Sequence, residues 1–173
     1  MGSLLSAEDI RVALDALAAK LEAAGLQREL VLVGGAALVL GYGAARSTRD
    51  VDACPLDDPI RAAARAVAGE LGLPSSWLSD DARAFMRGIS AGKVVFERPA
   101  LVARCASTEQ LLAMKVCAAR DEADWEDARL LLSAMGSDRD QVRLQIEPHL
   151  VAGKQKRGLE NFEDLWEELH GHR

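Results

Sequence analysis

The stretch LVLVGGAALVLGYG, residues 30–43, constrains the fold more than any other part of the chain. Its first four residues are leucine and valine, which is typical of a short buried strand. Gly34 and Gly35 then allow a tight turn, and the small and apolar residues from Ala36 to about Tyr42 predict a helix. A strand, a tight turn and a helix therefore follow one another directly.

A second strand, predicted for TRDVDACPL at residues 48–56, carries two acids on one face. Side chains alternate along a strand, so Asp50 and Asp52 point the same way, with Cβ atoms roughly 7 Å apart. Two carboxylates at this spacing repel each other, whereas a pair of divalent cations roughly 4 Å apart would turn the repulsion into binding. Magnesium suits such oxygen ligands.

The glycine pair supplies a second feature of a phosphate site. Residues without Cβ let backbone N–H groups approach a triphosphate, and the N-terminus of the following helix favours its negative charge. An alternative interpretation also fits: the glycines form an ordinary turn, and the two aspartates are solvated residues that pair with Arg46 and Arg49. Taken singly, each feature is compatible with this alternative.

The remaining elements follow from periodicity, caps and breakers. Ser6 and Asp9 resemble a capping box that opens a first helix, which Gly25 ends. We predict a helix at 58–71, a loop at about 72–86, short strands in KVVFE and ALVARCA, and further helices from Ser107, at about 122–135, 138–146 and 160–170. The fold class is α/β (α+β), a small mixed sheet flanked by helices, with an α/β core at 1–106 and a helical region at 107–173 packed on it.

Composition limits the classes of function. No apolar run approaches the roughly 18 residues that span a bilayer, and the N-terminal residues lack the pattern of a signal peptide. The three cysteines form no C-x-x-C pair. We therefore expect a cytoplasmic protein with no membrane partner. The net charge of −6 disfavours broad attraction to nucleic acid but allows a local basic patch.

The segment VGGAALVLGYGAARSTRDVDA resembles the DNA polymerase beta-like nucleotidyltransferase superfamily along its whole length. The resemblance implies that Gly34 and Gly35 hold the triphosphate and that Asp50 and Asp52 bind the metal ions. The residues of the same segment assigned to nucleotide binding are Gly34, Gly35, Arg46, Thr48 and Arg49.

A second segment, STEQLLAMKVCAARDEADWEDARLLL, is similar to the helical motif of the AbiEii-type toxin nucleotidyltransferases and their small relatives, including the mycobacterial tRNA-modifying toxins. In that motif a lysine is followed by an arginine and then D-x-x-D. The matching positions are Lys115, Arg120, Asp124 and Asp127. The resemblance implies catalytic roles for Lys115 and Asp127 and nucleotide binding by Arg120 and Asp124.

The helical geometry of this motif predicts a break. On one straight helix Lys115 would lie well over 100° away from Asp127, at about 100° per residue. We therefore expect the helix to be interrupted near RDEA, with Asp121 capping a second helix, so that Lys115 and Asp127 face each other. Lys115 stands in an otherwise apolar helix, where a lysine usually has a partner or a phosphate.

The third metal-binding carboxylate of the wider superfamily, usually on a later strand, has one candidate here. Glu97 ends KVVFE and is the acid at such a place. It is also interpretable as an exposed residue at the end of a strand.

Together these features predict a magnesium-dependent nucleotidyltransferase that uses a nucleoside triphosphate and two metal ions. The resemblance implies a tRNA 3′ end as acceptor, and a toxin of a bacterial toxin–antitoxin or phage-defence system with a cognate antitoxin. Two alternatives stay open: transfer to a small molecule or protein, and an inactive nucleotide-binding or regulatory module.

Overall fold

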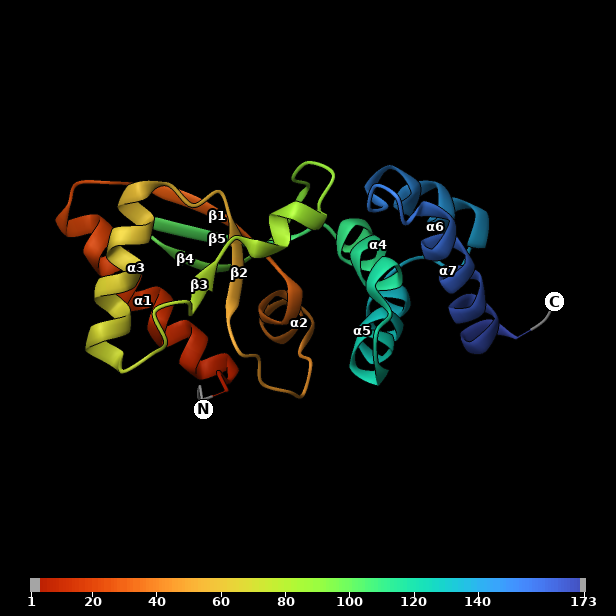
Figure 1. Cartoon of the computed structure of the whole chain (residues 1–173), viewed down its shortest axis with the longest axis horizontal. Helices are drawn as coiled ribbons and strands as arrows, with labels where there is room; N and C mark the ends of the chain where they lie inside the picture. Colours follow the sequence, from red (N-terminus) through yellow and green to blue (C-terminus); the bar gives the residue numbers. More distant parts are fainter. Residues whose placement is uncertain (1–3, 172–173) are drawn as a thin grey trace. The chain divides into compact units, whose positions relative to one another are not determined.

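The structure is a computed structural model that describes residues 4–171 of the 173-residue chain. The chain divides into two compact units (Figure 1). Unit 1 comprises Met1–Arg83 and Ala91–Ala106, and unit 2 comprises Ala84–Ser90 and Ser107–Arg173.

Unit 1 contains a five-stranded mixed sheet in the order β3-β2-β1-β5-β4. The predicted α/β fold class is confirmed. β1 pairs antiparallel with β2 and parallel with β5, and β5 pairs antiparallel with β4. The elements of unit 1 are α1 (Ala7–Ala23), β1 (Arg28–Val33), α2 (Gly34–Tyr42), β2 (Val51–Cys54), α3 (Asp58–Leu71), β3 (Leu78–Ser79), the start of the 3-10 helix η1 (Asp81–Phe85), β4 (Ala91–Arg98) and β5 (Leu101–Ala106). The last two residues of η1, Ala84 and Phe85, belong to unit 2.

Local signals set where these helices begin. Ser6 Oγ accepts the N–H of Asp9, and the Asp9 carboxylate accepts the N–H of Ser6, so the predicted capping box is confirmed. Asp57 caps α3 through the N–H of Ile60. The buried side of α1 repeats at helical spacing, with Ile10, Ala13, Leu14, Leu17, Ala18 and Leu21.

The helices α1 and α2 pack on the same face of the sheet. The Cys105 thiol of β5 donates to the carbonyl of Ala37 in α2. Residue 101 of β5 shares the face of Cys105 by alternation, and its partner Arg98 on β4 pairs with Asp15 of α1. Helix α3 lies beside α1 (Figure 1).

The strand register places Asp52 on the opposite face of the sheet from these helices. Leu32 of β1 is the neighbour of Cys105 and therefore faces the helices, as does its partner Ala53. Asp52 pairs with Val33, one residue further along, and so points the other way. Asp50 precedes β2 rather than lying within it.

The segment predicted as a loop at about 72–86 contains one strand and one short helix. Leu78 and Ser79 form β3 beside Val51 and Asp52, in parallel register. A two-residue strand has no readable periodicity, because its neighbour in the sheet rather than its own sequence defines it. The pairing of β3 with β2 brings the residues that follow β3 close to Asp52.

Unit 2 is helical in the part of the chain that the structure describes. It contains α4 (Thr108–Ala118), α5 (Glu122–Ser133), α6 (Arg139–Ile146), η2 (Glu147–His149) and α7 (Gln155–His170). The last helix begins earlier than the predicted 160. Ser107 caps α4 through the N–H of Gln110. The buried Gln110 side chain accepts the N–H of Ser90 and donates to the carbonyl of Gly88.

Candidate functional site: a glycine turn and a cluster of acids

The glycine turn at the start of α2 requires both of its glycines. Gly34 has φ of +61°, a conformation that side chains with Cβ rarely adopt. A Cβ built on Gly34 would lie 3.2 Å from Oδ2 of Asp52. The residue before the helix, Val33, provides no side-chain cap. The start of α2 therefore combines bare backbone with a carboxylate at close range.

The second glycine is in close contact with the loop that leads to the aspartates. A Cβ on Gly35 would lie 2.6 Å from Oγ1 of Thr48 and 3.8 Å from Nη1 of Arg46. Arg46 thus lies over the turn, while Arg49 is exposed. Thr48 is only 7% exposed, and its hydroxyl donates to the carbonyl of Asp50 at 3.1 Å. It was predicted to bind nucleotide, yet its side chain is occupied by the protein itself.

Asp52 accepts hydrogen bonds from β3 and from η1, which follows β3 in the chain. The Ser79 hydroxyl donates to Oδ1 of Asp52 at 2.8 Å, and the N–H of Ala82 donates to the same carboxylate. Burial raises the pKa of Asp52, and the charges of Asp50 and Asp81 raise it further against these two hydrogen bonds. The carboxylate is therefore fixed in orientation but crowded in charge.

Asp81 is the acid that the sequence interpretation missed. It follows β3 closely, and its charge raises the pKa of Asp50, where burial is the larger cause and Arg49 opposes it. Asp81 acts in the same direction on Asp52. Mutual repulsion of three carboxylates is the condition that a bound cation relieves. In the sequence Asp81 is the second acid of the pair DD that follows WLS. Its closeness to Asp50 and Asp52 can be inferred only once β3 is known to pair with β2.

Glu97 does not lie with these acids. It is exposed on the edge strand β4. Glu97 pairs with Val102 of β5, and Val102 pairs in turn with Glu29 of β1. Asp52 pairs instead with Val33, four residues further along β1, and lies three strands across the sheet. These offsets are about 13 Å along the strands and about 14 Å across them. Glu97 is therefore removed from the candidate metal ligands.

The acids do not form a complete ligand set as they stand. Among residues 4–171 no group of three or more His, Cys, Asp or Glu side chains is arranged to hold a metal ion. All three cysteines are free and buried. The candidate cation ligands are Asp50 and Asp52, and the charge of Asp81 raises the pKa of both.

The predicted residues of unit 2 form one compact cluster. α4 ends at Ala118 and α5 begins at Glu122 with Asp121 as its cap, so the predicted helix break is confirmed. The break brings Lys115 Nζ to 2.8 Å from Asp124 and 2.7 Å from Asp127.

Charge in this cluster is buried but paired. The side chain of Lys115 is 14% exposed, and those of its two partners are 5% and 3% exposed. Burial by itself would raise the pKa of Asp124, but hydrogen bonds from Lys115 and Arg120 lower it to about 2. Arg120 stands at the surface, with 78% of its side chain exposed. Ala119, in the turn between α4 and α5, has φ of 34°, an uncommon conformation for alanine.

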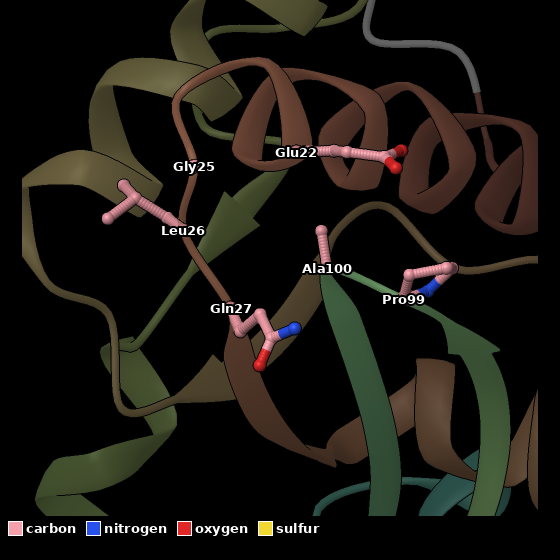
Figure 2. Close-up of a pocket in the computed structure, with 6 residues that line it drawn as sticks. All are labelled: Glu22, Gly25, Leu26, Gln27, Pro99 and Ala100. Carbon is pink, nitrogen blue, oxygen red and sulfur yellow. The ribbon is translucent and has the colours of Figure 1, made fainter.

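A separate pocket in unit 1 lies where β4 turns into β5, beside the end of α1 (Figure 2). Its lining residues are Glu22, Gly25, Leu26, Gln27, Pro99 and Ala100. None of the predicted site residues lines it, and its only charged lining side chain is an acid. The negative charge of Glu22 disfavours a triphosphate in this pocket.

Unit 1 is thus an α/β unit whose mixed sheet holds a glycine turn against Asp52. The chain belongs to a family described as "Nucleotidyltransferase of unknown function (DUF6036)", whose model matches residues 11–133. The match includes the glycine turn, the aspartates and the cluster around Lys115. No curated protein and no solved structure shows a significant match to the chain. Within residues 4–171, no helix has the length and apolarity to cross a membrane.

Proposed function

We propose that this protein transfers a nucleoside monophosphate from a nucleoside triphosphate to an acceptor hydroxyl and releases pyrophosphate. The observation that carries the proposal is the closeness of the glycine turn to Asp52, at 3.2 Å from the Gly34 Cβ position to the carboxylate. A helix N-terminus attracts phosphate, and carboxylates bind hard cations. A metal-bound triphosphate contains both of the groups that these neighbouring features bind.

The residues of unit 1 have distinct roles in this proposal. Backbone N–H groups of Gly34 and Gly35 bind the triphosphate, while Arg46 and Arg49 meet its remaining charge. Asp50 and Asp52 hold Mg²⁺, in a two-ion arrangement, and Asp81 adds negative charge beside them. Magnesium bound here would lower the pKa of the acceptor hydroxyl and neutralise charge on the phosphate. The crowded carboxylates fit a divalent cation, because its charge relieves their repulsion.

For the cluster of unit 2 we propose a role in handling phosphate. An ammonium group has three N–H donors, and two of those on Lys115 are directed at Asp124 and Asp127. The third donor is the one that would bind a phosphate oxygen. Asp127 holds the lysine or accepts the proton of the acceptor, and Arg120, anchored on Asp124, meets the nucleotide.

The acceptor that we propose is a tRNA 3′ end, in a bacterial toxin or phage-defence role opposed by an antitoxin. The support is the resemblance of the helical motif to the toxin-type enzymes, beside that of the glycine–aspartate segment to the wider superfamily. The net charge of −6 favours a second candidate, transfer to a small molecule or to a protein, which needs no basic groove. A nucleotide-binding module without catalysis is the non-enzymatic alternative.

The test uses the full chain with each α-³²P-labelled nucleoside triphosphate and Mg²⁺. Total tRNA, a protein lysate depleted of nucleic acid, and a filtered metabolite pool serve as three separate acceptors. The proposal expects label in one pool, and in tRNA if the acceptor is as stated. Asp52→Ala abolishes the label, whereas Glu97→Ala on the distant edge strand retains it. Nucleotide binding without transfer to any pool would leave the binding module as the function.

A further inference from the structure

Thr48 joins the N-terminal residues to the loop that carries the aspartates. Its N–H donates to the carbonyl of Leu5 at 2.9 Å, and its carbonyl accepts the N–H of Leu5 at 2.6 Å. These two bonds form an isolated antiparallel bridge outside the sheet. Leu5 is 2% exposed and Thr48 is 7% exposed, so the bridge is shielded from water. Buried backbone hydrogen bonds of this kind are costly to leave unmade.

The Thr48 side chain links the glycine turn to Asp50. Its hydroxyl proton goes to the Asp50 carbonyl, two residues ahead. The same oxygen lies 2.6 Å, and the Thr48 Cβ lies 3.0 Å, from where a Cβ of Gly35 would stand. Thr48 is therefore in direct contact with the bare backbone of residue 35. One side chain touches both halves of the proposed phosphate and metal site.

The loop around Thr48 has little other regular structure to hold it. α2 ends at Tyr42 with Gly43 as its left-handed cap, and β2 begins only at Val51. Between them the bridge to Leu5 is the one position of regular pairing among the described residues. Asp50 is thus held from two sides: β2 follows it, with the Val51 N–H donating to the carbonyl of Trp77, and Thr48 precedes it in the loop.

We propose that Thr48 is a positioning residue, braced by Leu5, that sets Asp50 against the glycine turn and does not itself bind nucleotide. This inference rests on the proposed function, because it assigns Thr48 a task in the site that binds the metal-bound triphosphate. Its hydroxyl proton is already given to Asp50, and the residue is almost wholly covered. Such a residue acts through the group that it orients.

The experiment compares Thr48→Val, which keeps the shape and removes the hydroxyl, with Thr48→Ser, which keeps the hydroxyl. Ser47→Ala removes a hydroxyl from the neighbouring position and serves as the matched control. Leu5→Pro removes the N–H that donates to Thr48. Two readouts are taken for each purified full-length variant. The first is the affinity for Mn²⁺-ATP, measured by the electron paramagnetic resonance of free Mn²⁺, and the second is hydrogen exchange in peptides covering residues 4–10 and 43–52.

The brace predicts that Thr48→Val and Leu5→Pro weaken Mn²⁺-ATP binding about fivefold or more and speed exchange in both peptides. Thr48→Ser and Ser47→Ala stay within about twofold of the wild type in affinity and exchange like it. Wild-type affinity and exchange in Thr48→Val overturn the inference. Loss of affinity in Thr48→Val with unchanged exchange, whether or not Thr48→Ser shares the loss, makes Thr48 a nucleotide contact and also overturns it.

The two proposals fail in different ways. If the wild type binds no Mn²⁺-ATP, the proposed function fails. The hydrogen exchange data then test the positioning role of Thr48 by themselves. Faster exchange in both peptides for Thr48→Val but not for Thr48→Ser supports this role, and unchanged exchange overturns it. A circular dichroism spectrum and a thermal melt confirm that each variant is folded. Should Leu5→Pro not fold, the comparison of Thr48→Val with Thr48→Ser decides the matter.

Discussion

Lys115 Nζ lies 2.7 Å from Oδ2 of Asp127, across the corner between α4 and α5. The same ammonium lies 2.8 Å from Asp124, so one partly exposed cation is shared by two buried carboxylates. The exposed Arg120 adds a second positive charge on Asp124. The cluster is thus balanced in charge, and it joins the two helices that the turn at 119–121 separates.

Replacing Lys115 by methionine should destabilise the fold strongly. The substitution keeps the length of the side chain but leaves two carboxylates buried without their cation, a loss of about 3–5 kcal/mol in the free energy of unfolding. Urea denaturation at neutral pH measures it. Lys156→Met is the matched control, because the Lys156 side chain is 92% exposed and its ion pair with Glu160 is long, at 3.8 Å. This substitution should change the free energy of unfolding by less than about 0.5 kcal/mol. A loss below about 1 kcal/mol for Lys115→Met would show that the cluster adds little to stability.

Acid should weaken the fold partly through Asp124. Its pKa is lowered from the ordinary 3.8 to about 2, so the folded state holds this carboxylate ionised more readily than the unfolded chain does. The resulting stability is fully present above about pH 4 and is lost as the pH falls toward 2. It amounts to about 2 kcal/mol.

Urea denaturation at several pH values between 2 and 6 tests this linkage. Asp124→Asn lacks the titrating group, so its free energy of unfolding should fall by about 2 kcal/mol less than that of the wild type over the same range. Other acids affect both curves, and only the difference between them is informative. Parallel curves would mean that the pKa of Asp124 is not lowered in the folded state.

The features that could be predicted from the sequence are local ones. The break between α4 and α5 follows from Asp121, whose side chain caps the second helix through the N–H of Asp124. The glycine turn and the strand of Asp52 are equally local, since an apolar run, a glycine pair and an alternating D-x-D each lie within a few residues. Antiparallel pairing of these two strands then brings Asp52 to the turn.

The features that the sequence hid depend on pairing between distant segments. Asp81 lies near Asp52 because the two residues of β3 pair with β2. A strand of two residues has no periodicity from which it could be predicted. Glu97 had the expected residue type at the end of a strand, but the order of strands puts β4 at the far edge from β2. Thr48 was predicted to bind nucleotide from its neighbours in the sequence. Its burial depends on Leu5, more than forty residues earlier.

The glycine turn should tolerate no side chain. In Gly35→Ala the new Cβ would stand 2.6 Å from Oγ1 and 3.0 Å from Cβ of Thr48, and Thr48 is fixed by its bridge to Leu5. The turn must shift, at a cost of about 1–3 kcal/mol. Gly69→Ala is the control: this glycine lies inside α3 with nothing within 4 Å of its Cβ position, so alanine should raise stability by about 0.5–1 kcal/mol. Urea denaturation of both variants measures the opposite signs, and a Gly35→Ala variant as stable as the wild type would contradict the close contact.

Asp81, and not Glu97, should be the third acid that strengthens cation binding. Asp81→Asn keeps the shape of the side chain and removes the charge that acts on Asp50 and Asp52, so the affinity for Mn²⁺ should fall about tenfold, as expected for the loss of one nearby negative charge. Glu97→Gln, on the opposite edge of the sheet, should leave the affinity within about twofold of the wild type. Titration of Mn²⁺ followed by electron paramagnetic resonance compares the two directly. If Glu97→Gln weakened Mn²⁺ binding and Asp81→Asn did not, the assignment of Asp81 as the third acid would be wrong.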